Sequence, residues 1–198
     1  MMNPYENCPV FENENYLLRL IEASDASDLL AVYSDENAWP IFNSDNCTGN
    51  FQIITLEQME RVINMWLHSY HISDFIRWTI YDKRVKKAVG TIELFNRKAN
   101  DYFNHCGLLR LDVGSEYERL ENLSEILSLI LMPTFEMFSC DMIATKIVSA
   151  AKERKNAFEA MGFTASAEKL IGGHTGKIYT DYYVFKNKMQ RHDGIPKG

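Results

Sequence analysis

Residues 106–138 read CGLLRLDVGSEYERLENLSEILSLILMPTFEMF, and the rest of the chain is most easily understood from this stretch. It begins as an apolar, strand-like run, passes through the turn GSEYE and continues into a segment with helical periodicity. Apolar residues three or four positions apart form one helical face, namely Leu120, Leu123, Leu127, Ile130 and Leu131. A strand, a tight turn and a helix N-terminus together aim unpaired backbone N–H groups at one spot, which favours an anion there. Because Pro133 removes a backbone donor, we expect a kink or an early end to this helix.

The segments after this helix predict a second strand beside the first. Residues 142–149 read as a strand, and a strand–helix–strand crossover of this length implies parallel pairing with residues 108–113. A short helix, KERKNAFEAM, follows and ends at Gly162, which supplies the left-handed conformation typical of a helix end. Two last strands, residues 163–169 and 178–185, flank the loop IGGHTGK.

The N-terminal half predicts one strand followed by two helices. Residues 16–21 are a strand candidate, and Ser24 stands where the N-cap of a first helix is expected. Thr55 and Gln58 make a capping box at the start of a second helix.

A loop and a hairpin complete the pattern. Residues 37–54 contain Trp39 and Phe42, and this loop is either a lid with its own small core or a wall of a substrate site. Residues 75–82 and 88–95 alternate with period two, which predicts an antiparallel hairpin. The basic run KRVKK between them is either an anion patch or a solvated hairpin tip, and we favour the tip.

Together these elements predict an α/β fold with the order β-α-α-β-β-β-α-β-α-β-β. The sheet is mixed and mainly antiparallel, with one central parallel pair. We expect one domain over residues 1–198, with a core from 11 to 186 and a flexible tail at 187–198.

Composition narrows the choice of partners and compartment. Acidic residues outnumber basic residues by 27 to 21, which argues against a nucleic acid or an anionic membrane as the main partner. The 4 cysteines are scattered, and we interpret them as reduced thiols of a cytoplasmic protein rather than as metal ligands or disulfides. No apolar run reaches the roughly 20 residues that a membrane span needs. The chain is expected to be a monomer or a homodimer.

Three stretches carry a resemblance to a known family. They are FENENYLLRLIEASDASDLLAVYSD, LRLDVGSEYERLENLSEILSLIL and NAFEAMGF. With the element order, they resemble the GNAT superfamily of N-acetyltransferases, and in particular the branch that acetylates the N-termini of ribosomal proteins. The resemblance spans residues 11–186 and implies a GNAT-like fold whose central parallel strands splay apart.

The resemblance implies acetyl-coenzyme A as co-substrate, no metal, and a primary amine of a protein N-terminus or small molecule as acceptor. The pantetheine arm would pair with the free strand edge, and the pyrophosphate would lie on the turn before the long helix. The residues implied at the cofactor are Leu111, Asp112, Val113, Arg119, Leu120, Glu121, Asn122, Leu123, Ser124 and Asn156.

The turn and the late helix depart from the family pattern. The family turn begins with Arg or Gln and has small residues at its fourth and sixth positions, where this chain has Asn122 and Ser124. Asn122 tolerates a left-handed conformation and would stand in for Gly there. Glu121 places a carboxylate beside the expected pyrophosphate. Phe158 stands where many members have a Tyr that protonates the leaving thiolate, and Lys152 stands where they have an Asn.

Glu93 and His105 are the preferred candidates for the general base, because the family's base usually lies on these strands and faces the cleft. Each also has an interpretation without function: a solvent-exposed strand residue for Glu93 and a surface residue for His105. Asp112 is an alternative base or a cap of the turn, and His174 reads as a loop residue. The expected function is acetyl transfer to an amine. The alternatives are a GNAT-fold binding or regulatory module without catalysis, and an enzyme that uses another acyl donor.

Overall fold

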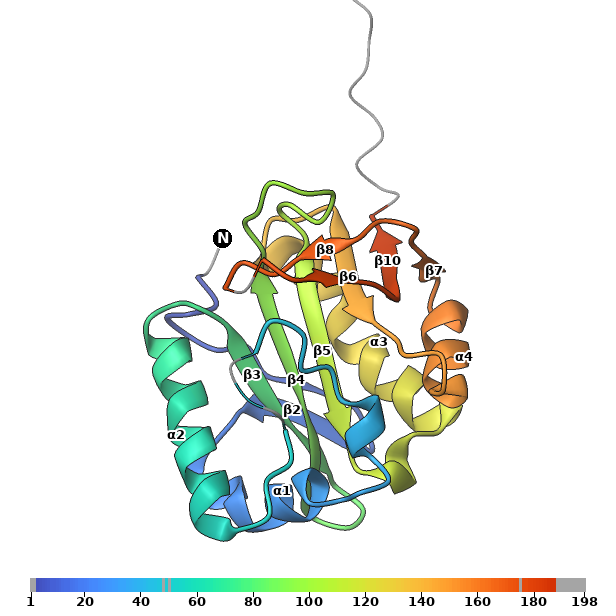
Figure 1. Cartoon of the computed structure of the whole chain (residues 1–198). Helices are drawn as coiled ribbons and strands as arrows, with labels where there is room; N and C mark the ends of the chain where they lie inside the picture. Colours follow the sequence, from blue (N-terminus) through green and yellow to red (C-terminus); the bar gives the residue numbers. More distant parts are fainter. Residues whose placement is uncertain (1–2, 48, 50, 175, 188–198) are drawn as a thin grey trace, which may run out of the picture.

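The computed structural model describes residues 3–47, 49, 51–174 and 176–187, which form a mixed sheet between two layers of helices (Figure 1). The main sheet has the order β1-β2-β3-β4-β5-β6-β10-β7, and β8 and β9 form a separate hairpin. The strands of the main sheet are β1 Phe11–Glu12, β2 Tyr16–Leu20, β3 Ile76–Asp82, β4 Lys87–Asn96, β5 Gly107–Val113, β6 Met142–Lys146, β7 Thr164–Ala165 and β10 Tyr182–Lys186. The hairpin consists of β8 Leu170–Ile171 and β9 Ile178–Tyr179.

The expected central parallel pair is confirmed. β5 and β6 pair in parallel, and every other neighbouring pair in the sheet is antiparallel. The parallel ladder contains 3 residue pairs, from Gly107↔Ile143 to Leu109↔Thr145. β5 continues to Val113 beyond the last of these pairs, so its far half is a free strand edge on the β6 side.

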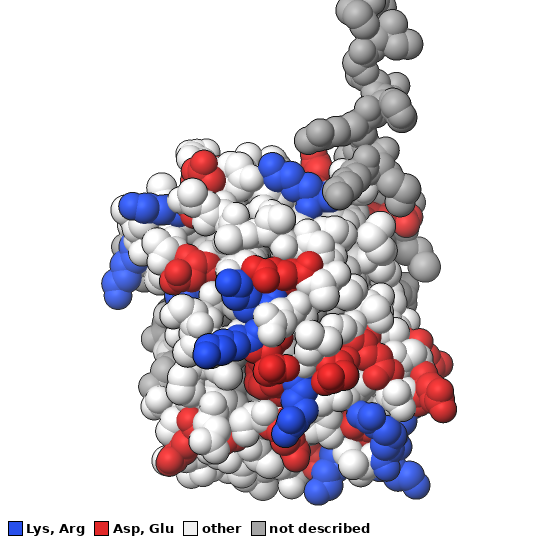
Figure 2. Space-filling model, turned by 90° about the vertical axis from the view of Figure 1, so that its right-hand side faces the viewer, with Lys and Arg blue, Asp and Glu red and all other residues white. Residues whose placement is uncertain are grey.

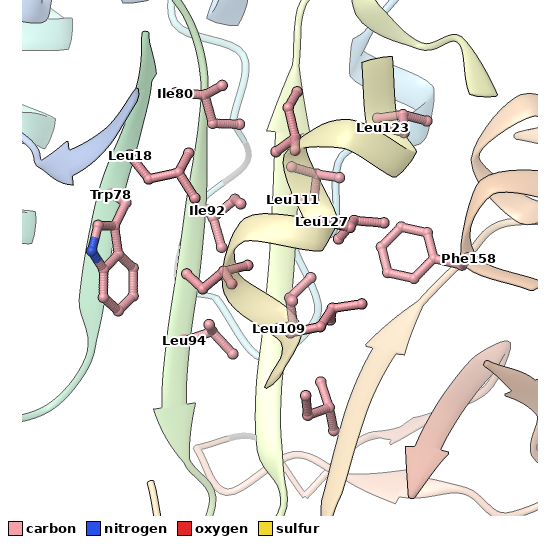
Figure 3. Packing of buried hydrophobic residues seen from close by; sticks show 14 of the residues in the cluster. Leu18, Trp78, Ile80, Ile92, Leu94, Leu109, Leu111, Leu123, Leu127 and Phe158 are labelled. Atoms are coloured by element: carbon pink, nitrogen blue, oxygen red, sulfur yellow. The ribbon is translucent and has the colours of Figure 1, made fainter. Parts of the chain in front are cut away.

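The helices lie on opposite faces of the sheet. α1 Ala26–Tyr33 and α2 Leu56–His71 pack on the front face in Figure 1, whereas α3 Leu120–Met137 lies behind it with α4 Lys152–Ala160 at its side. Strand alternation supplies the back face with apolar side chains, which pack against α3 (Figure 3). The labelled members of this core include Trp78, Ile92, Leu111 and Leu127.

Several expected boundaries were wrong. The strand expected over 163–169 is only β7, and the strand expected over 178–185 is split into β9 and β10. The split falls at Asp181, whose φ of 67° is left-handed and cannot continue a strand. α3 does not end early at Pro133, because it continues to Met137 with a buried face on both sides of the proline. The expected tail lies outside the described residues except for Asn187.

The two expected helix caps had different outcomes. Ser24 does not cap a helix: the chain first forms a 3-10 turn, Ala23–Asp25, with a capping box between Glu22 and Asp25. Thr55 and Gln58 do form the expected capping box of α2, with Thr55 Oγ1 accepting from the Gln58 amide at 3.2 Å.

Thr55→Ala is therefore expected to lower the free energy of unfolding by about 1 kcal/mol, because the amide of Gln58 loses its acceptor. Ser24→Ala is the matched control, and a change within about 0.5 kcal/mol is expected for this exposed residue. Urea denaturation of both variants measures the two values. Equal losses in the two variants would contradict the assignment of the cap.

Among the described residues, no helix is both long and apolar enough to cross a membrane, and no group of His, Cys, Asp and Glu is arranged to hold a metal ion. The 4 cysteines are free thiols. Arg84, Lys86 and Lys87 are exposed at the end of the β3–β4 hairpin, as expected for a solvated tip.

Candidate functional site

A cavity of about 430 Å³ lies between α2, the loop 37–54 and the front face of the sheet. Its walls are rich in aromatic side chains and its floor carries charged ones. The lining residues are Asn46, Cys47, Gly49, Phe51, Ile53, Val62, Met65, Trp66, Ser69, Asp74, Phe75, Arg77, Glu93, Phe95, Arg110 and His174. We call this space the front cavity.

A second cavity of about 340 Å³ adjoins the front cavity at its β10 side. Both spaces are lined by Asn46, Asp74, Phe95 and Arg110, so they share one wall. An aromatic space with a few convergent polar groups is the usual form of a small-molecule site.

The floor of the front cavity is a row of three charged side chains on three adjacent strands. Arg77 on β3 is the cross-strand neighbour of Glu93 on β4, which is in turn the neighbour of Arg110 on β5. Both arginines bind the Glu93 carboxylate, and no more than 7% of any of the three residues is exposed. Because alternate residues of a strand face the same side, this row lies opposite the apolar core.

A second polar row lies one step further along the strands. Arg77 also donates to Asp112 at 3.2 Å and to Thr91 at 2.9 Å. The Tyr33 hydroxyl from α1 donates to the same Asp112 carboxylate at 3.1 Å. The Arg77 guanidinium additionally lies 4.0 Å from the centre of the Trp66 ring, so α2 packs directly on the charged row.

The network moves the pKa values of its two carboxyl groups in opposite directions. Burial alone would raise the pKa of Glu93, but the nearby charges of Arg110 and Arg77 hold it below its usual value. Burial raises the pKa of Asp112, and the attraction of Arg77 and Arg154 does not overcome this effect. Glu93 therefore holds its negative charge to a lower pH than an ordinary glutamate, whereas Asp112 takes up a proton more readily.

These opposite shifts predict opposite pH dependences of stability. The contribution of Glu93 is complete above its unfolded-state pKa of about 4.3 and is lost as the pH falls through the lower folded-state value. The contribution of Asp112 is complete below about 3.9 and is lost as the pH rises through the higher folded-state value. The stability difference between wild type and Glu93→Gln is thus expected to shrink on acidification, and that for Asp112→Asn to grow. Urea denaturation between about pH 3 and pH 7 measures both differences, and slopes of the same sign would refute the assignment.

The structure separates the two preferred base candidates. Glu93 lines the front cavity, so its interpretation as a solvent-exposed residue was wrong. His105 is exposed, with a φ of 55° in the turn before β5, and is not among the residues lining either cavity. Asp112 does not cap the turn: its Oδ2 accepts from Tyr33 and Arg77, and its Oδ1 is buried without a hydrogen-bond partner among the described residues.

The expected cofactor residues fall into a buried set on β5 and a partly exposed set at the start of α3. Leu111, Asp112 and Val113 are no more than 1% exposed. In the second set Arg119 is the N-cap residue and Leu120 begins the helix, while Glu121, Asn122, Leu123 and Ser124 follow within it. Asn156 is exposed on α4, away from the buried side of that helix.

Two details of the α3 turn differ from expectation. Asn122 is an ordinary helical residue that accepts a hydrogen bond from Tyr16 at 3.1 Å, so it does not use a left-handed conformation. The Glu121 carboxylate is on an exposed residue, where water screens its charge. The Glu153 carboxylate of α4 instead reaches the helix terminus and accepts from the Leu120 amide at 3.1 Å.

Arg154 occupies the gap between the free edge of β5 and α4. Its guanidinium donates to the Leu111 carbonyl oxygen at 2.8 Å and forms an ion pair with Glu118 of the turn. It also lies 3.4 Å from the carbonyl oxygen of Ile41 in the loop 37–54. Nothing in the sequence predicts this contact, since Arg154 is one of the four consecutive charged residues of KERK.

The loop 37–54 combines its two expected roles. Phe42 and Ile53 are buried with α1 and α2, and Trp39 donates to the Tyr33 carbonyl oxygen at 2.7 Å. The cavity wall is formed by the later part of the loop, including Cys47 and Phe51, and not by Trp39 or Phe42. Trp39 and Phe42 thus belong to the small core of the loop, and later residues of the same loop line the cavity.

His174 was predicted from the sequence only as a loop residue. It lines the front cavity together with Glu93, and its backbone amide donates to Asn46 Oδ1 at 3.1 Å. This bond joins the loop after β8 to the loop 37–54. The spacing of residues in the sequence does not predict this hydrogen bond, because Asn46 and His174 are 128 positions apart.

No protein-family model matches this sequence, and no curated protein sequence matches it either. Solved structures do match the fold. The ribosomal-protein-S5-alanine acetyltransferase of Vibrio fischeri superimposes with a TM-score of 0.67 at 18% identity, covering 91% of this chain and 97% of that chain. RimJ of Mycobacterium smegmatis, in complex with CoA-disulfide, gives a TM-score of 0.70 at 10% identity, and the match covers 96% of this chain and 92% of that chain.

The spermidine N-acetyltransferase of Vibrio cholerae, in complex with CoA and spermine, is a third match. Its TM-score is 0.63 at 14% identity, and the match covers 88% of this chain and 97% of that chain. At these identities the likeness establishes the fold. The chain has the GNAT fold expected from its sequence.

Proposed function

We propose that this chain, which has the GNAT acetyltransferase fold, transfers the acetyl group of acetyl-coenzyme A to a primary amine. The observation that supports this most is the free edge of β5 beyond Leu109, which passes directly beside the charged floor of the front cavity. An extended amide chain adds to such an edge as a further strand. Two of the similar structures are complexes with CoA or CoA-disulfide, and one of these also contains the amine spermine, which supports this proposal.

In this proposal the donor runs along β5 and the acceptor amine enters from the front cavity. The amine nitrogen attacks the thioester carbonyl, the C–N bond forms, and the C–S bond breaks to release the thiolate. Holding the two reactants together supplies much of the rate increase. Phe158 is fully buried against Phe163 and has no proton to give, so the thiolate takes its proton from water.

The attacking amine must lose a proton, and we assign its acceptance to His174. A general base works best when its pKa lies near the working pH, and the arginines beside Glu93 move the pKa of that carboxyl away from this range. His105 and His174 are both exposed, but His105 lies outside both cavities. Imidazole is the side chain most often used for this task, and His174 places one in the cavity wall. Glu93 then serves as a positioning residue that fixes Arg77 and Arg110.

Acetylation assays test the proposal. The protein is incubated with acetyl-coenzyme A labelled in its acetyl group, and with peptides that have free or blocked N-termini and with a polyamine. Label in a free amine, and none in the blocked peptides, is the expected result. The amine that reacts fastest identifies the acceptor class, either a protein N-terminus or a small molecule.

A second candidate is a binding or regulatory module that has kept the fold without catalysis. Phe158 and the contact between Arg154 and β5 favour it, because the first removes a proton donor and the second fills part of the strand edge. Saturable binding of coenzyme A without transfer to any amine in the panel would select this candidate.

A further inference from the structure

The free edge of β5 already has an occupant from the chain itself. Beyond Leu109, β5 no longer pairs with β6, so a backbone carbonyl oxygen on this edge needs a hydrogen-bond donor from another part of the chain. The Leu111 carbonyl oxygen receives one from Arg154 Nη1 at 2.8 Å. Arg154 comes from α4, 43 positions later in the sequence.

Arg154 is held in this place from three sides. Only 2% of the residue is exposed, which is rare for arginine unless its charge is paired. The Glu118 carboxylate pairs with it in a two-point contact, in which Nε lies 3.2 Å from Oε2 and Nη2 binds Oε1. The carbonyl oxygen of Ile41 closes the front of the gap at 3.4 Å from Nη1.

A carboxylate also occupies the helix terminus beside this gap. Glu153, the neighbour of Arg154, accepts from the Leu120 amide at the start of α3. Figure 2 shows the face that carries α3 and α4, and its acidic and basic side chains are mixed rather than uniformly basic. A phosphorylated ligand therefore meets negative groups as well as positive ones on its way to the turn.

We propose that Arg154 acts as a plug: it blocks the free edge of β5, where the donor would bind, and Glu118 holds it there. An acyl-coenzyme A then binds only after Arg154 leaves the Leu111 carbonyl oxygen. The inference rests on the proposed function, because it concerns the same strand edge. A pantetheine amide that pairs with β5 needs the Leu111 carbonyl, which the guanidinium now takes. Opening the plug breaks a buried ion pair, and this cost is subtracted from the binding free energy of the donor. The wild type thus binds its donor weakly until α4 and the turn separate.

Calorimetric titration with coenzyme A tests the plug in four variants. Arg154→Ser removes the guanidinium and leaves a small side chain, while Glu118→Gln removes the lock and keeps the arginine. The double variant Glu118→Gln/Arg154→Ser removes both without leaving an unpaired buried charge. Lys155→Ser is the matched control on the same helix, where the lost ion pair with Glu159 is about half exposed to water.

The double variant is expected to bind coenzyme A at least about ten-fold more tightly than the wild type, which corresponds to about 1.4 kcal/mol. Glu118→Gln should show a smaller gain, and Lys155→Ser no change. Weaker or unchanged binding in the double variant, with wild-type thermal unfolding, would overturn the proposal and make Arg154 a phosphate-binding residue or a structural one. If Arg154→Ser does not fold, the Glu118→Gln gain decides alone.

The acetylation assay separates this inference from the proposed function. Tighter binding in the variants without transfer to any amine supports the plug and rejects the enzyme. Efficient transfer by the wild type, with a donor affinity that none of the substitutions raises, supports the enzyme and rejects the plug.

Discussion

Replacing Arg77 with alanine is expected to lower the free energy of unfolding by about 3–5 kcal/mol, a large share of the stability of a domain. The substitution leaves Glu93 with one of its two cations and Asp112 without the cation that pairs with it, in a region that is no more than 1% exposed. It also removes the guanidinium that packs under Trp66 of α2. A buried carboxylate without its cation is costly because the protein interior solvates it poorly.

The matched control is Arg61→Ala on α2, the helix whose Trp66 packs on Arg77. Arg61 pairs with Glu57 four positions earlier, and their side chains are 61% and 78% exposed. An exposed pair of this kind contributes about 0.5 kcal/mol or less. Urea denaturation at neutral pH measures both variants. If Arg77→Ala costs no more than Arg61→Ala, then the charged row does not hold the floor of the cavity as described.

His174→Ala is expected to lower kcat for acetyl transfer by about 10²-fold or more, the usual contribution of a positioned general base. The affinity for coenzyme A should stay unchanged, because His174 lines the front cavity and not the β5 edge. The profile of kcat against pH should lose its rise on the acidic side, since the group that must be deprotonated is gone. Steady-state kinetics with the fastest amine of the panel supplies both quantities.

His105→Ala is the matched histidine control for this prediction. His105 is exposed before β5 and does not line either cavity, so its replacement should leave kcat and the pH profile as in the wild type. A large loss in His105→Ala with a normal His174→Ala would reverse the assignment and restore the base predicted from sequence. A loss in Glu93→Gln with an unchanged pH profile would fit its role as a positioning residue.

The fold was predictable because its strands and helices carry clean periodicities. The period-two alternation of β3 and β4 and the crossover between β5 and β6 were sufficient to predict the hairpin and the central parallel pair, which the structure confirms. Short strands near the C-terminus were less predictable. A single left-handed residue, Asp181, divides the strand predicted over 178–185 into β9 and β10. Aspartate adopts this conformation too seldom for the break to be predicted from the sequence.

The site was less predictable because it depends on contacts between distant segments. A charged residue within an alternating strand, such as Arg77 in β3 or Glu93 in β4, usually indicates a solvated face, and nothing local shows that α2 covers this one. Arg154 and Lys155 are equivalent in sequence, yet one is buried against Leu111 and the other is exposed. Which residue enters the gap is decided by the helix phase and by Glu118, which lies 36 positions earlier.

The location at which coenzyme A binds on the chain tests the proposed donor site most directly. Amide chemical shifts in a ¹⁵N-labelled sample, recorded during titration with coenzyme A, report which backbone groups it contacts. We expect the largest changes at Leu111 and Val113 on the free edge of β5, and at residues 120–123 at the start of α3, with smaller changes at Arg154 as the plug opens. Saturable binding whose shifts fall elsewhere, and leave β5 and α3 unchanged, would contradict the assignment of the donor site.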